Sequence, residues 1–417
     1  MEKLKIAVIG GGASGMMAAV TAARYGADVC IFERNDRVGK KILVTGNGKC
    51  NFSNTNLAKE FYFCDDEDLL YSVLQQFQTK DIITFFEQSG MLIKDKNHYL
   101  YPASEQASTI LDIFRIHIKK EHITVRTDEK VTEVKWSMKN NQFIVSSSRG
   151  DYYYDRVILS TGGKASPKTG SDGNGFLTAR SFGHSIAPVV PALVQLRCNE
   201  QYLKSIAGVR EDAIIRLVID QRETISERGE LQFTDYGVSG IVVFQLSRVA
   251  AYAIAEKKNV KIYIDSLPTF SDTEYLEWMQ ERKELCRNAE TVEEFFTGMI
   301  HKKLLHLFIR LAGLKPEDEY QKADLSKIDK VFQYCKKFVL EVNGTNHFDQ
   351  AQVSAGGVLL HEVTKHMESK KRKGLFFSGE ILNVDGKCGG YNLHWAWASG
   401  YVAGRYAATN IVKEDKS

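Results

Sequence analysis

Apolar residues near the start of the chain form two short runs on either side of a longer periodic segment. Leu4–Ile9 and Ala27–Phe32 are largely apolar and have the length of buried strands. From Ala13 onward, small and apolar residues follow the spacing of a helix that packs closely on a sheet. A strand, a helix and a second strand within about 30 residues are typical of a βαβ unit with parallel strands.

The pattern continues with helical and then strand-like segments. Residues 67–120 carry helical spacing in two pieces, which are separated by a short hairpin that ends at Pro102. Residues 123–159 alternate between apolar and polar positions, which predicts an antiparallel meander that returns to the main sheet. The last of these strands ends in Thr161 and Gly162, small residues where a strand meets a closely packed neighbour.

Composition changes twice in the remainder of the chain. Residues 192–267 are rich in strands with one helical stretch near 239–257, whereas residues 272–341 form amphipathic helices with few glycines. Glycine-rich junctions then return over residues 351–404. We therefore predict one discontinuous domain that is interrupted by two inserts. The predicted bounds are 1–190 and 345–417 for the discontinuous domain, 191–270 for a β-rich insert and 271–344 for a helical insert.

The glycine-rich turn after the first predicted strand gives the clearest indication of a ligand-binding site. Gly10 permits a tight turn, Gly12 lets the backbone approach a pyrophosphate, and Gly15 lets helix and strand pack closely. The free N–H groups at the start of the helix attract phosphates. Glu33, at the end of the second strand, can accept hydrogen bonds from an adenosine ribose. A glycine-rich turn without a ligand is the alternative, but the complete βαβ setting favours a dinucleotide site.

A second glycine-rich junction lies in the last quarter of the chain. A strand over residues 375–378 is followed by Gly379 and Glu380, and a loop then leads to Gly389 and Gly390. We predict a helix from about Asn392, so that its N–H groups and positive dipole end point out of the loop. In a flavoprotein, this end would stabilise negative charge on the reduced isoalloxazine. The alternative is a glycine-rich connection with no ligand.

Composition limits the classes of function. The 417 residues suggest two or three domains, and a formal net charge of +3 gives no electrostatic reason to expect nucleic acid as a partner. The seven cysteines lack a CxxC motif or a Cys/His cluster, so we expect reduced thiols, no metal site and a cytoplasmic protein.

The N-terminus does not have the pattern of a targeting segment. Gly10–Gly15 interrupts its apolar residues, which argues against a secretion signal, and no apolar run is long enough to cross a bilayer. We expect a small-molecule substrate, and the oligomeric state stays open.

Several segments together resemble the bacterial NAD(P)/FAD-dependent oxidoreductases that include the bile-acid-inducible reductase and aminoacetone oxidase-type enzymes. The resemblance runs from residue 6 to residue 400 and is most specific where KCN precedes GGYNL. The matching segments are VIGGGASGMMAA, KKILVTGNGKCN, STGG with GSDGNGF, FTDYGVSG, QVSAGGV, HMESK and SGEILNVDGKCGGYNLHWAWASG.

The resemblance implies an α/β fold with a Rossmann-like FAD-binding domain of the two-dinucleotide-binding type, and with β-barrel-like and helical insertions. It also implies which residues contact the cofactor, with Val131 acting through its backbone. Together with the motif residues above, the candidate FAD contacts are Gly10, Gly12, Ser14, Gly15, Glu33, Arg34, Lys41, Thr45, Gly46, Cys50, Asn51, Val131, Thr161, Gly162, Gly379, Glu380, Asn392 and Leu393.

The expected activity is hydride transfer between the flavin and a small organic substrate, in the form of reduction of an activated C=C bond. The alternatives are oxidation of an amine or amino-ketone with O₂, and a flavin-bearing protein of RNA modification. No second GxGxxG lies between a strand and a helix, so NADH or NADPH would have to visit the flavin transiently, or electrons come from elsewhere. The chemistry would belong to the flavin, and the sequence identifies no catalytic side chain.

Other residues admit both a chemical and a structural interpretation. Tyr99 and Tyr101 either face the substrate or pack within an aromatic hairpin. Cys50 is better explained as a small buried residue than as half of a redox-active disulfide. His394 stands where we expect related chains to carry Gln, and it either titrates beside the ring or packs and caps.

Overall fold

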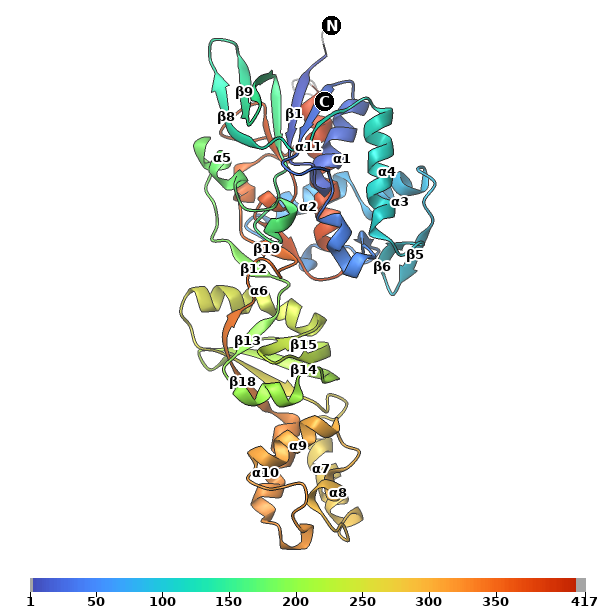
Figure 1. The fold of residues 1–417 in the computed structure, drawn as a ribbon, viewed down its shortest axis with the longest axis vertical. Coiled ribbons are helices and arrows are strands. Elements are labelled where there is room, and N and C mark those ends of the chain that lie inside the picture. Colours follow the sequence, from blue (N-terminus) through green and yellow to red (C-terminus); the bar gives the residue numbers. More distant parts are fainter. Residues whose placement is uncertain (1–2, 410–417) are drawn as a thin grey trace. The chain divides into compact units, whose positions relative to one another are not determined.

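The computed structural model describes residues 3–409, and the chain divides into two compact units (Figure 1). One unit comprises the residues up to Val190 and from Gln352 onward, and the other comprises Pro191–Ala351. Residues 1–2 and 410–417, which the predicted discontinuous domain includes, lie outside the described residues.

A parallel five-stranded sheet forms the centre of the first unit. Its order is β20-β11-β1-β2-β7, so a strand from the last fifth of the chain extends the sheet that the N-terminal βαβ unit begins. The apolar runs predicted as strands are almost fully buried within it. The strands are β1 (Lys5–Ile9), β2 (Asp28–Phe32), β7 (Thr124–Arg126), β11 (Arg156–Leu159) and β20 (Leu375–Phe377).

Two helices from opposite ends of the chain cross in direct contact on this sheet. They are α1 (Ala13–Arg24) and α11 (Tyr391–Ala408). A Cβ atom at Gly400 would lie 2.5 Å from the Ser14 carbonyl oxygen, and one at Gly404 would lie 2.3 Å from that of Ala18. Glycine at these two positions therefore lets the backbones of α1 and α11 approach closely.

The helices between residues 67 and 120 follow the predicted periodicity, and α5 is an addition that the sequence analysis did not predict. The segment predicted as two helical pieces holds three helices, because Phe77 is extended and a capping box between Gln78 and Asp81 starts a new helix. The helices are α2 (Glu67–Gln76), α3 (Thr79–Glu87), α4 (Ala107–Lys120) and α5 (Gly175–Ser181).

Short antiparallel sheets complete the first unit. The predicted meander is present as β8-β9-β10, and the predicted hairpin as β5-β6, to which β3 adds a third strand. Their bounds are β3 (Ser53–Asn54), β5 (Ile93–Lys96), β6 (Tyr99–Pro102), β8 (Val131–Ser137), β9 (Gln142–Ser147) and β10 (Gly150–Tyr154). The other short strands are β4 (Tyr62–Cys64), which pairs with β21 (Val384–Gly386), and β12 (Val190–Ala192) and β19 (Val353–Ala355).

The second unit combines a closed six-stranded barrel with a group of helices. The barrel order is β13-β16-β15-β14-β17-β18, and the four helices α7–α10 are inserted between the adjacent strands β17 and β18. The strands are β13 (Leu196–Cys198), β14 (Arg210–Ile219), β15 (Arg222–Phe233), β16 (Gly237–Ser239), β17 (Val260–Asp265) and β18 (Phe338–Thr345). The helices are α6 (Ile241–Ala255), α7 (Asp272–Leu285), α8 (Val292–Phe296), α9 (Lys302–Leu311) and α10 (Leu325–Lys336).

This arrangement confirms the predicted α/β fold with a barrel-like part and a helical part. Within residues 3–409, no helix has the length and apolar character that crossing a membrane requires. The same residues contain no group of three or more His, Cys, Asp or Glu side chains arranged to hold a metal ion. All seven cysteines carry free thiols.

Candidate functional site

The glycines of the first turn have different physical roles. Gly10 has a positive φ of +104°, and a Cβ there would lie 2.5 Å from the Ser160 carbonyl oxygen. A Cβ at Gly15 would lie only 1.9 Å from the Gly10 carbonyl oxygen, so packing within the protein excludes any side chain at both positions. A Cβ at Gly12, by contrast, would meet nothing within 4 Å. Gly12 is the N-cap of α1 and provides no side-chain cap, which leaves the first N–H groups of the helix without a capping side chain.

Glu33 lies at the end of β2 and is buried, with 7 % of its surface exposed. One carboxylate oxygen accepts a hydrogen bond from the Gly11 N–H at 2.9 Å, and the other accepts from the backbone and side chain of Asn35 at 2.8 Å each. Burial raises the pKa of Glu33, although these hydrogen bonds oppose the rise. The carboxylate is thus fixed beside the glycine turn, where the ribose of a dinucleotide would lie.

Two further candidate contacts flank Glu33. Arg34 forms an ion pair with Asp172, a residue in the GSDGNGF segment that sequence reasoning did not assign to the site. The backbone N–H of Glu129 donates to the Glu33 carbonyl oxygen at 3.0 Å, and Val131, two residues later, opens β8. The backbone of Val131 therefore lies in a segment attached directly to the end of β2.

The segment around Thr45 is irregular and contains an unpaired polar atom. The short helical turn Ile42–Gly48 is broken at Gly46, whose φ is +53°, and the Thr45 hydroxyl donates to the Ile42 carbonyl oxygen at 2.6 Å. The Oδ1 atom of Asn51 is buried without a hydrogen-bond partner in the described part of the chain. An orphaned buried acceptor is costly unless a ligand satisfies it.

Cys50 fills the core beside Asn51. Its side chain is fully buried, and burial raises the pKa of the thiol to about 11. The thiol is therefore protonated at neutral pH, and no other cysteine is bonded to it. This agrees with the structural interpretation of Cys50.

The strand end at Thr161 presents a second orphaned polar atom. The Oγ1 atom of Thr161 is buried without a hydrogen-bond partner among the described residues. Gly162, which follows, has a φ of +72°, and a Cβ there would lie 2.7 Å from the Ser171 hydroxyl. Because β11 is the neighbour of β1, this strand end lies beside the glycine turn. A Cβ at Gly10 would also lie 3.1 Å from the Thr161 Cα.

Segments from the two ends of the chain meet at Gly379 and Glu380. A Cβ at Gly379, whose φ is +77°, would lie 2.4 Å from the Ser14 hydroxyl in the first turn of α1. Glu380 pairs with Lys41 at 2.6 Å and also accepts from the backbone N–H and hydroxyl of Ser354, at 2.8 and 2.9 Å. Ser354 belongs to the QVSAGGV segment and was not predicted as a site residue.

The last helix begins with an open N-terminus, as predicted. Its first residue is Tyr391, one position before the predicted start, and its N-cap is Gly390, with a φ of +90° and no side-chain cap. The Asn392 side chain accepts from the Gly386 N–H at 2.8 Å and donates to the Gly386 carbonyl oxygen at 2.7 Å. Asn392 therefore holds the preceding loop with its side chain, and its own N–H and that of Leu393 remain available in the first turn.

All candidate contacts lie in the first unit, and several come together in pairs. Gly379 meets Ser14, Lys41 meets Glu380, and a Cβ at Gly390 would lie 2.8 Å from the orphaned Asn51 Oδ1. The open space at Gly12, two uncapped helix N-termini and two orphaned buried polar atoms fit a flavin adenine dinucleotide with its pyrophosphate at α1.

His394 is a packing residue in this structure. It is fully buried, its Nδ1 lies 2.9 Å from the Ser53 hydroxyl, and its Nε2 lies 3.2 Å from the Phe77 carbonyl oxygen. Burial lowers the pKa of His394 to about 4, so the ring is neutral at neutral pH. Of the two interpretations, the structure supports packing.

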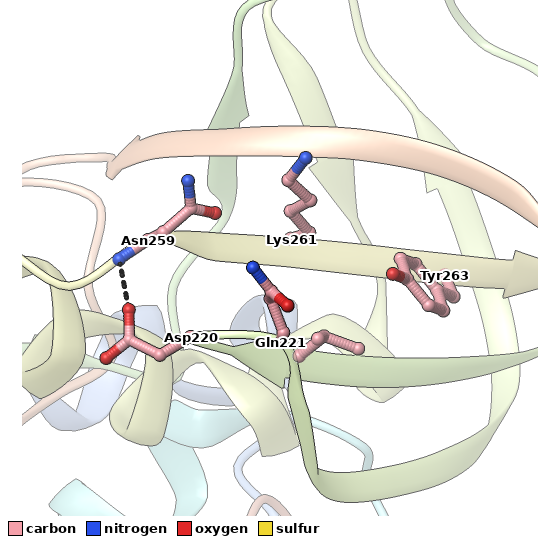
Figure 2. Close-up of a pocket in the computed structure, with 6 residues that line it drawn as sticks. Asp220, Gln221, Asn259, Lys261 and Tyr263 are labelled. Atoms are coloured by element: carbon pink, nitrogen blue, oxygen red, sulfur yellow. Dashed lines mark hydrogen bonds between the residues drawn. The ribbon is translucent and has the colours of Figure 1, made fainter.

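A cavity of about 350 Å³ is lined only by residues of the second unit (Figure 2). It is formed by the β14–β15 turn and the start of β17, where Asp220 accepts a hydrogen bond from the Asn259 N–H at 3.1 Å. Its lining contains no glycine motif and no helix N-terminus, so it lacks the features of a dinucleotide site. The lining residues are Val218, Asp220, Gln221, Asn259, Lys261 and Tyr263.

Comparison with known proteins gives matches along nearly the whole chain. A family model described as HI0933-like protein Rossmann domain matches residues 4–406. The chain is 39 % identical over 407 residues to the 3-dehydro-bile acid delta(4,6)-reductase of Clostridium scindens, which covers 97 % of this chain and 99 % of that protein. It is 25 % identical to the ribosomal RNA dihydrouridine synthase of Haemophilus influenzae, over 95 % of this chain and 96 % of that protein.

Among solved structures, 3-ketosteroid delta1-dehydrogenase from Sterolibacterium denitrificans is 11 % identical, with a TM-score of 0.49 over 98 % of this chain and 100 % of that chain. The sequence matches confirm the resemblance to the reductase family, the Rossmann-type fold and the assignment as an oxidoreductase. The chain belongs to the HI0933-like Rossmann-domain family.

Proposed function

We propose that this protein is an FAD-dependent reductase that adds a hydride and a proton to a C=C bond conjugated with a carbonyl group in a small organic substrate. The observation that carries the proposal is the 39 % identity, over nearly the full length of both chains, to an enzyme named as a bile acid delta(4,6)-reductase. The candidate site supports it, because its open glycine turn and orphaned polar atoms fit the cofactor that such a reaction needs.

The residues of the site have distinct tasks in this proposal. The N–H groups after Gly12 bind the pyrophosphate, and the buried carboxylate of Glu33 accepts hydrogen bonds from the ribose. The bound flavin supplies the hydride. The uncapped N–H groups and positive dipole end in the first turn of α11 would stabilise negative charge on the reduced ring and so would raise its reduction potential. Because the chain carries no second dinucleotide motif, NADH or NADPH would bind only transiently, or another donor would supply the electrons.

Anaerobic half-reactions test the proposal. Protein loaded with FAD is reduced with one equivalent of dithionite and is then mixed with a 3-oxo-4,6-dienoic bile acid or with 2-cyclohexenone. We expect the flavin absorbance to return as one C=C bond of the substrate is reduced, which gives cyclohexanone from 2-cyclohexenone and a monoenoic product from the dienoic bile acid. We expect reoxidation by air alone to be slower. Rapid reoxidation by air with hydrogen peroxide, and none by either carbonyl compound, would refute the reductase and favour an amine or amino-ketone oxidase.

A second candidate is reduction of uracil in ribosomal RNA. The specific observation is the 25 % identity to two ribosomal RNA dihydrouridine synthases over at least 95 % of this chain. The reaction would be of the same type as the reduction proposed for the small organic substrate, because the uracil C5=C6 bond is also conjugated with a carbonyl group. The near-neutral net charge of +3 gives it no electrostatic support. Reoxidation of the flavin by protein-free ribosomal RNA, with dihydrouridine in the digested RNA, would favour this candidate over the small-molecule one.

A further inference from the structure

The turn between β7 and β8 is bonded to the backbone of the segment that carries Glu33. The Glu33 N–H donates to the Arg126 carbonyl oxygen at 2.9 Å, and the Glu33 carbonyl oxygen accepts from the Glu129 N–H at 3.0 Å. The Asn35 carbonyl oxygen accepts from the Asp128 N–H at 2.9 Å. Both backbone polar groups of Glu33 are therefore held by one turn, residues 126–129.

Glu129 places a fully buried carboxylate in this turn, with 0 % of its side-chain surface exposed. Its Oε1 accepts a hydrogen bond from the Ser147 hydroxyl at 2.6 Å. Its Oε2 has no hydrogen-bond partner among residues 3–409, and lies 3.6 Å from the guanidinium of Arg126 and 3.9 Å from that of Arg149. Burial opposes ionisation, but hydrogen bonds such as that of Ser147 and the two positive charges lower the pKa of Glu129. It is therefore a carboxylate at neutral pH.

The charge of Glu129 connects the two ends of the turn. A buried carboxylate is costly unless cations compensate it, and Arg126, at the end of β7, is the nearer of its two cations. Arg149, in the connection from β9 to β10, also donates to the Thr127 and Asp128 carbonyl oxygens at 3.2 and 3.3 Å. Glu129 thus closes the 126–129 turn and fastens it to the end of β9.

The same carboxylate is linked to a second candidate contact of the cofactor. Ser147, which donates to Glu129, pairs with Val131 in the antiparallel ladder of β8 and β9. Val131 and Glu33 are both candidate FAD contacts. Glu129 is therefore bonded through its backbone to Glu33 and through its side chain to the strand partner of Val131.

We propose that Glu129 is a positioning residue for recognition of the FAD ribose, an inference that rests on the FAD binding of the proposed function. Its charge holds the 126–129 turn closed, and the turn fixes the backbone of Glu33. The Glu33 carboxylate is thereby kept in place to accept hydrogen bonds from the ribose. Glu129 is itself fully buried and acts on the cofactor only through Glu33 and the turn.

A purely structural role for Glu129 predicts different energetics. If Glu129 only stabilised the first unit, its replacement would weaken FAD binding equally with and without the Glu33 side chain. If Glu129 acts through Glu33, its replacement has no further effect once the Glu33 side chain is removed, because residues that act as one unit are not additive. A double-mutant cycle separates these two roles.

The test is calorimetric titration of FAD into E129Q, E33A and the double variant E33A/E129Q. E129Q should bind FAD about tenfold more weakly than the unaltered protein, and E33A/E129Q should bind within about twofold of E33A. E133Q is the matched control, because Glu133 is an exposed glutamate of β8 that pairs with Lys135. It should bind FAD like the unaltered protein.

A second variant covers the case in which E129Q does not fold, which urea unfolding without FAD would show. S147A keeps the charge of Glu129 and removes its direct hydrogen bond. It should weaken FAD binding less than E129Q does, and its effect should also disappear in the E33A background.

The outcomes separate this inference from the proposed function. Equal losses with and without the Glu33 side chain would overturn the positioning role, as would unchanged FAD affinity in E33A or in both E129Q and S147A. None of these results bears on reduction of the enone. If the unaltered protein binds FAD but reduces neither the enone nor the bile acid, the proposed reaction fails and the role of Glu129 in FAD binding is still decided by the cycle. If it binds no FAD, both proposals fail.

Discussion

Replacing His394 with Gln should make the first unit more resistant to acid. The Phe77 carbonyl oxygen can only accept, so the Nε2 of His394 carries the proton and its Nδ1 accepts from the Ser53 hydroxyl. A Gln side chain can keep both interactions through its amide, because it offers one donor and one acceptor. It cannot acquire a positive charge. The substitution therefore removes the titration while retaining the packing pattern.

The magnitude follows from the depressed pKa. His394 has a pKa of about 4 when folded, against 6.5 for the exposed group, so protonation favours the unfolded chain. The stabilisation by the neutral ring is fully present above pH 6.5 and is lost as pH falls toward 4. Linkage gives a loss of about 2 kcal/mol between pH 7 and pH 5, and roughly 3 kcal/mol below pH 4.

Urea unfolding at pH 7 and pH 5 measures this difference, followed by tryptophan fluorescence, to which the buried Trp395 and Trp397 of the first unit contribute. We expect the unaltered protein to lose about 2 kcal/mol more than H394Q over this range. H122Q, a change at an exposed histidine of the same unit, should behave as the unaltered protein. Equal pH dependence in H394Q and the unaltered protein would contradict the buried, neutral assignment.

Three further predictions concern the cofactor site and the helix crossing. Because a Cβ at Gly12 meets no protein atom, G12A should unfold like the unaltered protein without FAD yet bind FAD at least about tenfold more weakly, by calorimetric titration. E33A should weaken FAD binding about 10- to 100-fold in the same titration, because a hydrogen bond to a charged acceptor contributes about 1.5–3 kcal/mol. Unchanged affinity would show that Glu33 does not contact FAD. G400A should lower the free energy of unfolding by about 1–3 kcal/mol, since its Cβ would lie 2.5 Å from the Ser14 carbonyl oxygen, and urea unfolding that matches the unaltered protein would disprove this contact.

The local pattern of apolar residues and glycines was enough to predict the strands and helices on which the candidate site residues lie. The run Leu4–Ile9, the glycine turn and the small residues of the first helix specify one βαβ unit, because each signal lies within a few residues of the next. The start of α11 was predicted to within one residue, since a glycine-rich loop is followed there by a run of Trp and small residues that is typical of a buried helix.

Long-range partners could not be predicted in the same way. Glu380 pairs with Lys41, far away in the sequence, and Ser354 supports it from a third segment. Nothing near Ser354 distinguishes it from other small polar residues. The ion pair between Arg34 and Asp172 also joins segments that are far apart in the sequence. The glycines around Asp172 did, however, indicate that its segment could belong to the site. Such pairings depend on the order of strands in the sheet, which local periodicity does not contain.

The strand order also explains why the site needs both ends of the chain. β20 pairs with β11, the neighbour of β1, and Gly379, two residues after β20, packs against Ser14 at the start of α1. The two N-termini proposed to bind the cofactor, those of α1 and α11, are therefore held by one sheet and one helix crossing. A cofactor that binds both N-termini stabilises the folded first unit by RT ln(1 + [FAD]/Kd), because the unfolded chain offers neither N-terminus. Changes at the α1–α11 crossing should consequently weaken FAD binding without touching the cofactor.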